Sequence, residues 1–504
     1  MGSLKPNLLL ITSDQQHWQT LGVNNPRIKT PNLDRLAREG LICDRAYCPN
    51  PTCSPSRASM ITGRYPSQHG CWTIGVKLPE ETPTVGEALQ GQGYGTTLVG
   101  KAHFHPVAST PESPSLESQP KLRDLDFWRG FHGPWYGFEH IEVARGHGDE
   151  HLVGQHYAIW MEEKGLDNWR DYFGAWPPRE DEPRRRGAWE VPEEFHYTTW
   201  TGERTIANLE RHAEEGRPFF MFVNFHDPHP PYLTSEPWAS MYRPEDMEPG
   251  RLAESEMDLL PPHFQKTQER SPDYSMYKET YGAHGFHSHL IDEQRLRENI
   301  AVYYGMISFM EAWIGRILEA LERLGQAEKT LVVFTTDHGH FLGQHGLVAK
   351  GAFHFEDMIR VPMLVRYPGV VPAGSASSGL VSLVDLAPTF LSAAGVEAPG
   401  AMQGVDQLPC WRGEVERARE SVIVENRYEP TRVHLRTYVD ERYKITVYRD
   451  QSYGEMFDLV EDPGETRNLW DDPGKQELKC ELLRRFVNAE LKREPMLMPR
   501  VAEA

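Results

Sequence analysis

Short apolar runs separated by amphipathic stretches set the pattern of this chain. Nearly uninterrupted apolar residues recur at 7–12, 96–99, 219–225, 330–335 and 361–365. A strand that is apolar at almost every position must be buried on both faces, as in a sheet covered by helices on two sides. The pattern therefore predicts an α/β fold in which these runs form a buried sheet between two helical layers.

One long amphipathic stretch comes before the run at 330–335. Between Glu298 and Leu324 apolar residues recur at steps of three and four, and Gly325 follows as a stop signal. This spacing predicts a helix that packs one face on the sheet and leads into the strand beginning at Thr330.

The pattern changes near residue 416. Closely spaced short runs occur at 422–424, 433–439, 443–448 and 456–459. Such runs, with turn residues between them, predict a small antiparallel sheet, and a helix is expected over 475–491. We therefore expect a large α/β domain at 1–415 and a C-terminal α+β subdomain at 416–504.

The stretch 106–200 is rich in Trp, Pro, Gly and charged residues and shows weak periodicity. We expect a loop-dominated insertion there. Insertions of this size are more often functional than idle, so this one is predicted to form the wall or lid of a substrate pocket.

Composition narrows the classes of partner. The 504 residues include 53 Lys and Arg against 73 Asp and Glu, a net charge of −20. An acidic chain repels polyphosphate backbones, so no nucleic-acid partner is expected, whereas a local cationic pocket for a small anion is compatible with it. No apolar run approaches the roughly 18 residues of a membrane span. With six cysteines and no Cys-x-x-Cys pair, the chain is expected to be cytoplasmic, with reduced thiols and no membrane partner.

Two acidic segments follow predicted strands. Asp14 and Gln15 come after the first run, and Asp337 and His338 come after the fourth. In an open α/β sheet, ligands bind beyond the carboxyl ends of the strands, where these side chains would converge. Their oxygen and nitrogen atoms suit a divalent metal ion. The alternative, that the acidic residues only cap helices, stays open at this point.

A third candidate segment contains a cysteine. Cys53 is followed by Pro55 within a first helical turn, and Arg57 lies four residues on, on the same face. Free backbone N–H groups and a guanidinium at a helix N-terminus would hold a tetrahedral oxyanion. A buried cysteine beside a structural arginine is the competing interpretation.

Residues 53–57 together with 62–64 match the Cys-x-Pro-Ser-Arg and Thr-Gly-Arg signature of the type I, formylglycine-dependent sulfatases of the alkaline phosphatase superfamily. The chain also resembles that family at 100–103, at 227–230 and over 337–350. The resemblance implies a large, mainly parallel mixed sheet sandwiched by helices, with a small C-terminal antiparallel sheet.

The resemblance also implies a nucleophile and a metal. Cys53 would be oxidised to formylglycine by a formylglycine-generating maturation enzyme. In the hydrated aldehyde, one hydroxyl attacks and the second expels the product. One divalent ion would be held by Asp14, Gln15, Asp337 and His338 together with residue 53.

Further roles follow from the same resemblance. Arg57 would orient the aldehyde hydrate, and Lys101 and Lys350 would bind the nonbridging oxygens of a small anionic ester. Lys350 or His229 would donate a proton to the departing alkoxide. His103 would take the proton of the second hydroxyl.

The sequence departs from the family at the metal. Most sulfatases have Asp-Asp and Asp-Asn where this chain has Asp14-Gln15 and Asp337-His338, a variant that resembles the phosphonate monoester hydrolases. A nitrogen ligand and one fewer carboxylate make Mn²⁺ competitive with Ca²⁺. Lys101 and His103 follow the sulfatase pattern.

We therefore expect a sulfate monoesterase of arylsulfatase type, with a promiscuous side activity toward phosphonate and phosphate diesters. A phosphonate monoester or phosphodiester hydrolase with the same nucleophile is the main alternative. A noncatalytic relative that binds metal or anion is the second. A homo-oligomer, either a dimer or a tetramer, is also expected from the resemblance.

Overall fold

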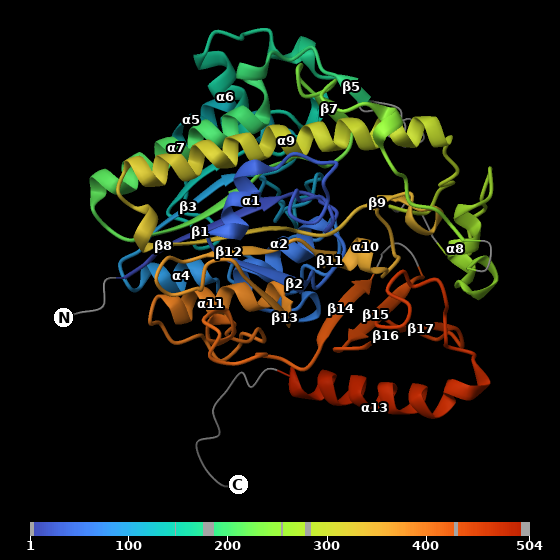
Figure 1. The fold of residues 1–504 in the computed structure, drawn as a ribbon. Coiled ribbons are helices and arrows are strands. Elements are labelled where there is room, and N and C mark those ends of the chain that lie inside the picture. The colour runs from blue at the N-terminus through green and yellow to red at the C-terminus, as the bar shows by residue number, and fades with distance from the viewer. Residues whose placement is uncertain are drawn as a thin grey trace.

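A computed structural model describes residues 5–146, 148–174, 186–253, 256–277, 284–427 and 432–494. Figure 1 shows a central sheet with helices above and below it, and a smaller sheet backed by one helix at the C-terminal end of the described chain. Of the predicted insertion at 106–200, residues 147 and 175–185 lie outside the described residues.

The central sheet is mixed and mainly parallel, as expected. In order across the sheet, its strands are β11 (Arg360–Val361), β2 (Leu41–Tyr47), β12 (Leu364–Arg366), β8 (Thr330–Thr336), β1 (Asn7–Ser13), β6 (Phe219–Asn224), β3 (Gly95–Gly100) and β4 (His140–Val143), and β13 (Ser375–Ser382) also pairs with β2. The strands from β8 to β4 run parallel to one another, whereas β12 is antiparallel to both its neighbours.

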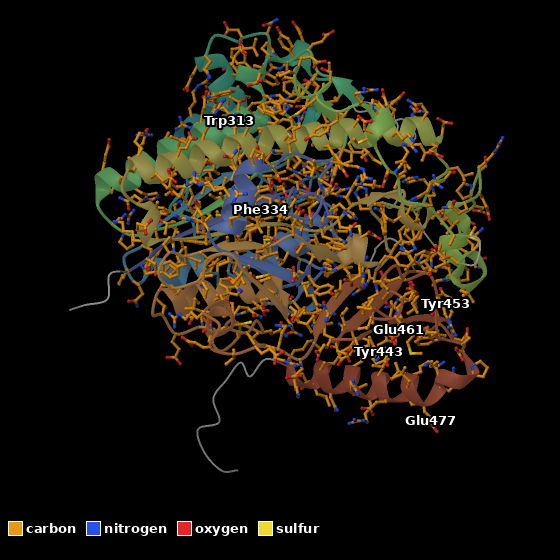
Figure 2. All side chains as sticks on the ribbon, in the orientation of Figure 1. Trp313, Phe334, Tyr443, Tyr453, Glu461 and Glu477 are labelled. Carbon is orange, nitrogen blue, oxygen red and sulfur yellow. The ribbon has the colours of Figure 1, made fainter. Side chains whose placement is uncertain are left out.

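Both faces of the sheet are buried. Along β1, Leu8 and Leu10 belong to one apolar cluster, while Leu9 and Ile11 belong to the other. One face is covered by α1 (Pro31–Arg38), α7 (Tyr197–Glu215) and α9 (Glu293–Arg323), and the other by α2 (Cys53–Thr62), α4 (Val85–Gln90) and α11 (Leu386–Ala393). Trp313 on α9 and Phe334 on β8, both labelled in Figure 2, belong to the apolar cluster between the sheet and helices α1, α7 and α9. The continuous apolar runs thus reflect burial on two sides.

Two predicted elements differ from the structure. The run 361–365 is not one strand, because β11 ends at Val361 and β12 begins at Leu364. Pro362 lies in the break, where its missing N–H leaves no donor for a sheet ladder. The long helix begins at Glu293 rather than Glu298, since the side chain of Asp292 caps it by accepting from the backbone N–H of Arg295 at 3.2 Å.

The insertion is more ordered than predicted. It contributes α5 (Leu125–Gly130), α6 (Gln155–Glu163) and strand β4, which extends the central sheet beside β3. Several of its aromatic residues, including Trp169 and Trp200, form a separate buried cluster, while others, including Trp128 and Trp135, join the core beneath the sheet. Weak periodicity in this segment therefore reflects short elements around an aromatic core.

The C-terminal sheet and helix are confirmed. The antiparallel strands are β14 (Val422–Arg427), β15 (His434–Val439), β16 (Tyr443–Tyr448) and β17 (Gly454–Asp458). Helix α13 (Gln476–Lys492) packs Leu482 and Phe486 against Ile445 of this sheet. No helix in the described part of the chain is long and apolar enough to cross a membrane.

The remaining elements are short. They are α3 (Pro66–His69), α8 (Pro262–Thr267), α10 (Glu356–Ile359), α12 (Leu408–Trp411), the paired strands β5 (Arg186–Ala188) and β7 (Tyr232–Thr234), and the hairpin of β9 (Phe341–Leu342) and β10 (Val348–Ala349). The hairpin matters for the site because β10 is followed directly by Lys350.

Candidate active site

The carboxyl ends of the central parallel strands meet at one edge of the sheet. Ser13 at the end of β1 pairs with Thr336 at the end of β8, and Gly100 at the end of β3 pairs with Asn224 at the end of β6. The residues that follow are therefore delivered to one place, as the sequence predicted. Helix α2 points its N-terminus at the same edge and begins with Cys53.

Four candidate metal ligands come together there. One ligand atom from each of Asp14, Cys53, Asp337 and His338 lies within 4.8 Å of the others, and all four residues are buried. The Cys53 Sγ atom is 3.2 Å from His338 Nε2 and 3.6 Å from Asp14 Oδ1. Two carboxylates and an imidazole beside a reactive side chain are a donor set that suits a divalent cation.

Gln15 fits the same site through an unsatisfied atom. Its backbone N–H donates to Asp337 Oδ1 at 2.9 Å, and its side-chain nitrogen lies 2.7 Å from His340 Nδ1. Its Oε1 atom is buried and has no hydrogen-bond partner among the described residues. A buried carbonyl oxygen without a partner is costly, and coordination of a cation would satisfy it.

Arg57 connects three of the strand ends. Its Nε donates to Asp337 Oδ2 at 2.9 Å, and its Nη1 donates to Asn224 Oδ1 at 2.9 Å and to the Lys101 carbonyl at 3.1 Å. The guanidinium is completely buried. The planar guanidinium of an arginine can hold several acceptors in a fixed geometry. Arg57 therefore fixes the position of the Asp337 carboxylate in the site.

Two lysines lie at the Cys53 site and act electrostatically on its thiol. Lys101 forms a fully buried ion pair with Asp14. Lys350 donates to Cys53 Sγ at 3.2 Å and contacts His229 Nε2 at 3.1 Å. His229 Nδ1 donates to the carbonyl of Pro230, so its Nε2 is the acceptor for the Lys350 ammonium. The structure thus brings Lys350 and His229 to one side of Cys53.

The charged groups around Cys53 favour the anionic form of its side chain. Burial and the Asp14 carboxylate act to raise the pKa of the Cys53 thiol, but Lys101 and Lys350 outweigh them and this pKa lies below its usual value. Burial and Lys350 hold the pKa of His229 well below its ordinary value, so its ring is neutral. A neutral ring is consistent with its role as an acceptor.

His103 lies near this group but is held by two residues that sequence reasoning missed. Its Nε2 is 2.9 Å from Arg145 Nη2, and its backbone N–H donates to the Glu117 carboxylate at 2.8 Å. Glu117 and Arg145 belong to the insertion. Arg145 lies two residues beyond β4, whose sequence His-Ile-Glu-Val is not a continuous apolar run, so the rule for strand ends that identified Asp14 and Asp337 had no signal there.

A sulfatase family model matches residues 6–396, most of the chain. The chain belongs to the sulfatase family. A second model, for the C-terminal region of N-sulphoglucosamine sulphohydrolase, matches residues 343–492. The sheet order and the family together place this sulfatase in the alkaline phosphatase superfamily, as expected.

The relatives of this sulfatase include a multifunctional member of the alkaline phosphatase superfamily, an arylsulfatase and a phosphonate monoester hydrolase. It is 30% identical to the multifunctional alkaline phosphatase superfamily protein PehA of Trinickia caryophylli, over 80% of this chain and 77% of that one. It is 28% identical to an arylsulfatase of Clostridium perfringens, over 91% and 89%. The solved phosphonate monoester hydrolase of Agrobacterium radiobacter superposes with a TM-score of 0.80 at 26% identity, covering 98% of this chain and 97% of that one.

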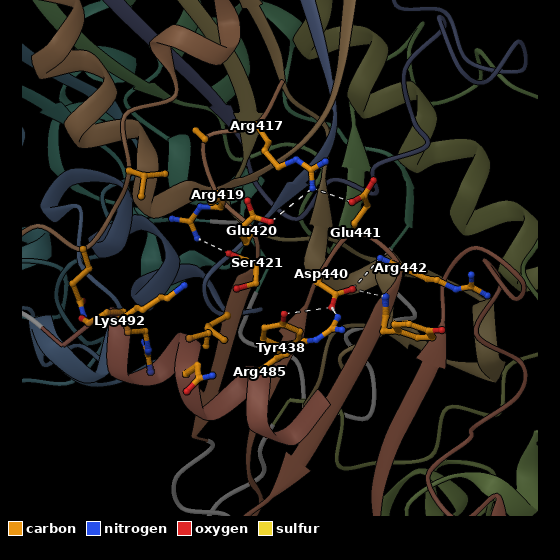
Figure 3. A pocket seen from close by; sticks show the side chains of 18 of the residues that line it. Arg417, Arg419, Glu420, Ser421, Tyr438, Asp440, Glu441, Arg442, Arg485 and Lys492 are labelled. Atoms are coloured by element: carbon orange, nitrogen blue, oxygen red, sulfur yellow. Dashed lines mark hydrogen bonds and ion pairs between the residues drawn. The ribbon is translucent and has the colours of Figure 1, made fainter. Parts of the chain in front are cut away.

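A separate cavity of about 940 Å³ lies between the C-terminal sheet and α13 of this sulfatase, away from Cys53. In Figure 3, dashed lines join Arg417 and Arg485 of this cavity to neighbouring acidic side chains. Arg417 pairs with Glu441 at 3.0 Å and Arg485 with Asp440 at 3.2 Å. Because these charges are already compensated, the cavity does not compete with the Cys53 site for an anionic ester.

Proposed function

We propose that this chain hydrolyses sulfate monoesters of arylsulfatase type, using a nucleophile derived from Cys53 and one divalent metal ion. The observation that carries the proposal is the position of Cys53. Its sulfur lies 3.2 Å from Lys350 Nζ within a buried group that also contains Asp14, Asp337 and His338. An anionic ester requires cationic side chains and a metal requires carboxylates, and both kinds of group lie at this site.

In this proposal Cys53 is the precursor of the nucleophile. A maturation enzyme, together with the oxidant that it uses, removes two electrons from Cβ; the C–S bond and one C–H bond are replaced by the C=O bond of formylglycine, and the sulfur leaves at the oxidation level of sulfide. The hydrated aldehyde supplies one hydroxyl for attack on the ester and a second to release the product. A cysteine thiolate lacks that second hydroxyl, so the sulfated thiol would have no comparable exit.

The metal is proposed to be Ca²⁺ or Mn²⁺, held by Asp14, Gln15, Asp337 and His338. When bound, such an ion lowers the pKa of a coordinated hydroxyl and neutralises charge on an ester oxygen. The buried, unpartnered Oε1 of Gln15 supports this assignment.

The chain's own residues bind and orient the ester. Lys101, which pairs with Asp14, and Lys350, which contacts residue 53, bind the nonbridging oxygens. Lys350 donates the proton to the departing alkoxide, because His229 uses its Nδ1–H toward the Pro230 carbonyl and its Nε2 accepts from the Lys350 ammonium at 3.1 Å. Arg57 keeps Asp337 in place by a hydrogen bond of 2.9 Å.

Hydrolysis of phosphonate monoesters or phosphodiesters is the second candidate. The pairs Asp14-Gln15 and Asp337-His338 favour it, as does the structural likeness to the phosphonate monoester hydrolase of Agrobacterium radiobacter. Lys101 and His103 favour the sulfate monoester, because a diester carries a substituent where one of the charged oxygens would meet the Lys101 ammonium or an N–H group of His103.

One comparison tests the proposal. Hydrolysis of nitrophenyl sulfate and of the nitrophenyl ester of phenylphosphonic acid is measured on the same purified protein, after mass spectrometry has established conversion of Cys53. We expect the larger kcat/KM for the sulfate. A larger value for the phosphonate would reverse the order, and no turnover of either ester by converted protein would favour a noncatalytic binder.

A further inference from the structure

The backbone at His103 is held in an uncommon conformation by an insertion residue. His103 has φ of 59°, in the left-handed region that few residues other than glycine adopt. The buried carboxylate of Glu117 accepts from the N–H of His103 at 2.8 Å and from the N–H of His105 at 2.7 Å. Strained backbone held from outside its own segment is characteristic of positions where a side chain must be aimed.

The ring of His103 is held by a second insertion residue. Arg145 Nη2 lies 2.9 Å from His103 Nε2, and both side chains are buried. A guanidinium has no acceptor, so the Nε2 lone pair accepts the hydrogen bond and the ring proton resides on Nδ1. Burial, Arg145 and Lys101 keep the pKa of His103 well below its ordinary value, so the ring is neutral.

The remaining ring nitrogen is available to a ligand. His103 Nδ1 is buried and has no hydrogen-bond partner within the described parts of the chain. His103 lies two residues after Lys101, whose ammonium pairs with Asp14, so its ring belongs to the segment that borders the anion site. A buried N–H donor without a partner would be costly in the absence of an acceptor, and an ester oxygen is such an acceptor.

We propose that Glu117 and Arg145 are positioning residues that present His103 to the ester as a neutral Nδ1–H donor. This inference rests on the proposed function and deepens it. It assigns His103 hydrogen-bond donation to an ester oxygen, with no proton transferred, in place of the proton-accepting role that the family resemblance implies. The insertion then shapes the site through the orientation of one imidazole.

Substitutions at His103 test which ring nitrogen matters. In His103→Asn the amide nitrogen takes the place of Nδ1, and in His103→Gln it takes the place of Nε2. His103→Gly is the matched control, because asparagine and glycine both tolerate a positive φ. We expect kcat/KM of His103→Asn to exceed that of both other variants at least about tenfold, the effect of one well-placed donor. Equal losses in all three variants would overturn the donor role.

A double-mutant cycle tests Arg145. The probe is inorganic sulfate, whose binding is measured by calorimetry and needs no turnover. In the wild-type background we expect Arg145→Met to weaken sulfate binding at least about fivefold, and Arg145→Lys to retain most of the wild-type affinity. In the His103→Gly background, Arg145→Met should weaken sulfate binding by less than about a further twofold. An equal effect of Arg145→Met in both backgrounds would overturn the positioning role.

Measuring sulfate binding and ester hydrolysis separately distinguishes this inference from the proposed function. If the wild-type protein binds sulfate and shows the expected coupling but hydrolyses neither ester, the proposed function fails and the positioning of His103 stands. If it hydrolyses nitrophenyl sulfate but Arg145 and His103 act independently, the proposed function stands and the positioning fails.

Discussion

Arg57 and Asp337 form a completely buried ion pair in which the guanidinium Nε donates to the carboxylate Oδ2 at 2.9 Å. The same guanidinium reaches Asn224 and the Lys101 carbonyl, so it joins helix α2 to the ends of β3, β6 and β8. Fixing a candidate metal ligand in this way links the fold of the sheet edge directly to the geometry of the site.

Removal of Arg57 should therefore reduce stability as well as activity. Loss of one partner from a buried pair costs about 3–5 kcal/mol, so Arg57→Ala should lower the free energy of unfolding by about that much. Urea unfolding measures the effect. The control is Arg243→Ala, since the side chain of Arg243 is 71% exposed; a loss no larger than that of this variant would contradict the role given to Arg57.

Conversion of Cys53 is testable with an internal standard. Trypsin should release residues 46–57, which contain both Cys48 and Cys53. Conversion to formylglycine lowers the mass of this peptide by about 18 Da, and the denatured peptide then takes up iodoacetamide only at Cys48. Two alkylated cysteines in a preparation that hydrolyses esters would contradict the proposed nucleophile, and Cys53→Ala should abolish turnover.

Lys350 is expected to act as the proton donor to the leaving group. An alkyl sulfate needs this proton far more than a nitrophenyl sulfate, whose leaving group is stable as an anion. Lys350→Met should therefore raise the ratio of kcat/KM for the nitrophenyl ester over the alkyl ester by at least about tenfold, within the range expected for general acid catalysis.

Lys101→Met is the matched control for that measurement. Lys101 forms its ion pair with Asp14, whereas Lys350 is the lysine in contact with His229 Nε2, so the loss of Lys101 should lower both rates by a similar factor. If Lys350→Met also lowers both rates equally, Lys350 binds the anion only and the proton comes from another group.

The sequence predicted those parts of the site that depend on strand ends. Asp14 and Asp337 were found because parallel strands end at one edge, and Cys53 because a proline marks the first turn of α2. Arg145 was missed because its position depends on β4 joining the sheet beside β3, a long-range pairing that the weakly periodic insertion does not signal. The orientation of the Gln15 amide likewise depends on a contact of its nitrogen with His340, far along the chain, which leaves Oε1 without a hydrogen-bond partner among the described residues.

The metal ligands should determine which ion is bound. Gln15→Asp combined with His338→Asn replaces an amide and an imidazole by a carboxylate and an amide oxygen. Oxygen-only ligands favour Ca²⁺, whereas a nitrogen ligand favours Mn²⁺. After dialysis against a chelator and reloading from an equal mixture, elemental analysis should show a higher ratio of Ca²⁺ to Mn²⁺ in the variant than in the wild type. An unchanged ratio would contradict the assignment of these two ligands.

His345 should make stability depend on pH. Its Nδ1 contacts Glu256 Oε2 at 2.6 Å, its Nε2 lies 3.6 Å from Asp357 Oδ2, and its ring stacks on Phe355. Burial opposes the charged ring, but the carboxylates of Asp357 and Glu256 outweigh it and raise the pKa of His345 to about 9. His17 shares Asp357 from the other side, at 2.8 Å.

Because the folded pKa of His345 lies above the unfolded value of about 6.5, the charged ring contributes stability that is complete below about pH 6.5 and is lost as the pH rises through about 9. His345→Asn keeps a residue that tolerates the local φ of 55°. At pH 6 it should lower the free energy of unfolding by about 3 kcal/mol, and the difference should shrink toward zero by about pH 10. Urea unfolding at several pH values, with the exposed His287→Asn as control, measures this; a difference that stays constant with pH would show that packing of the ring, rather than its charge, stabilises the protein.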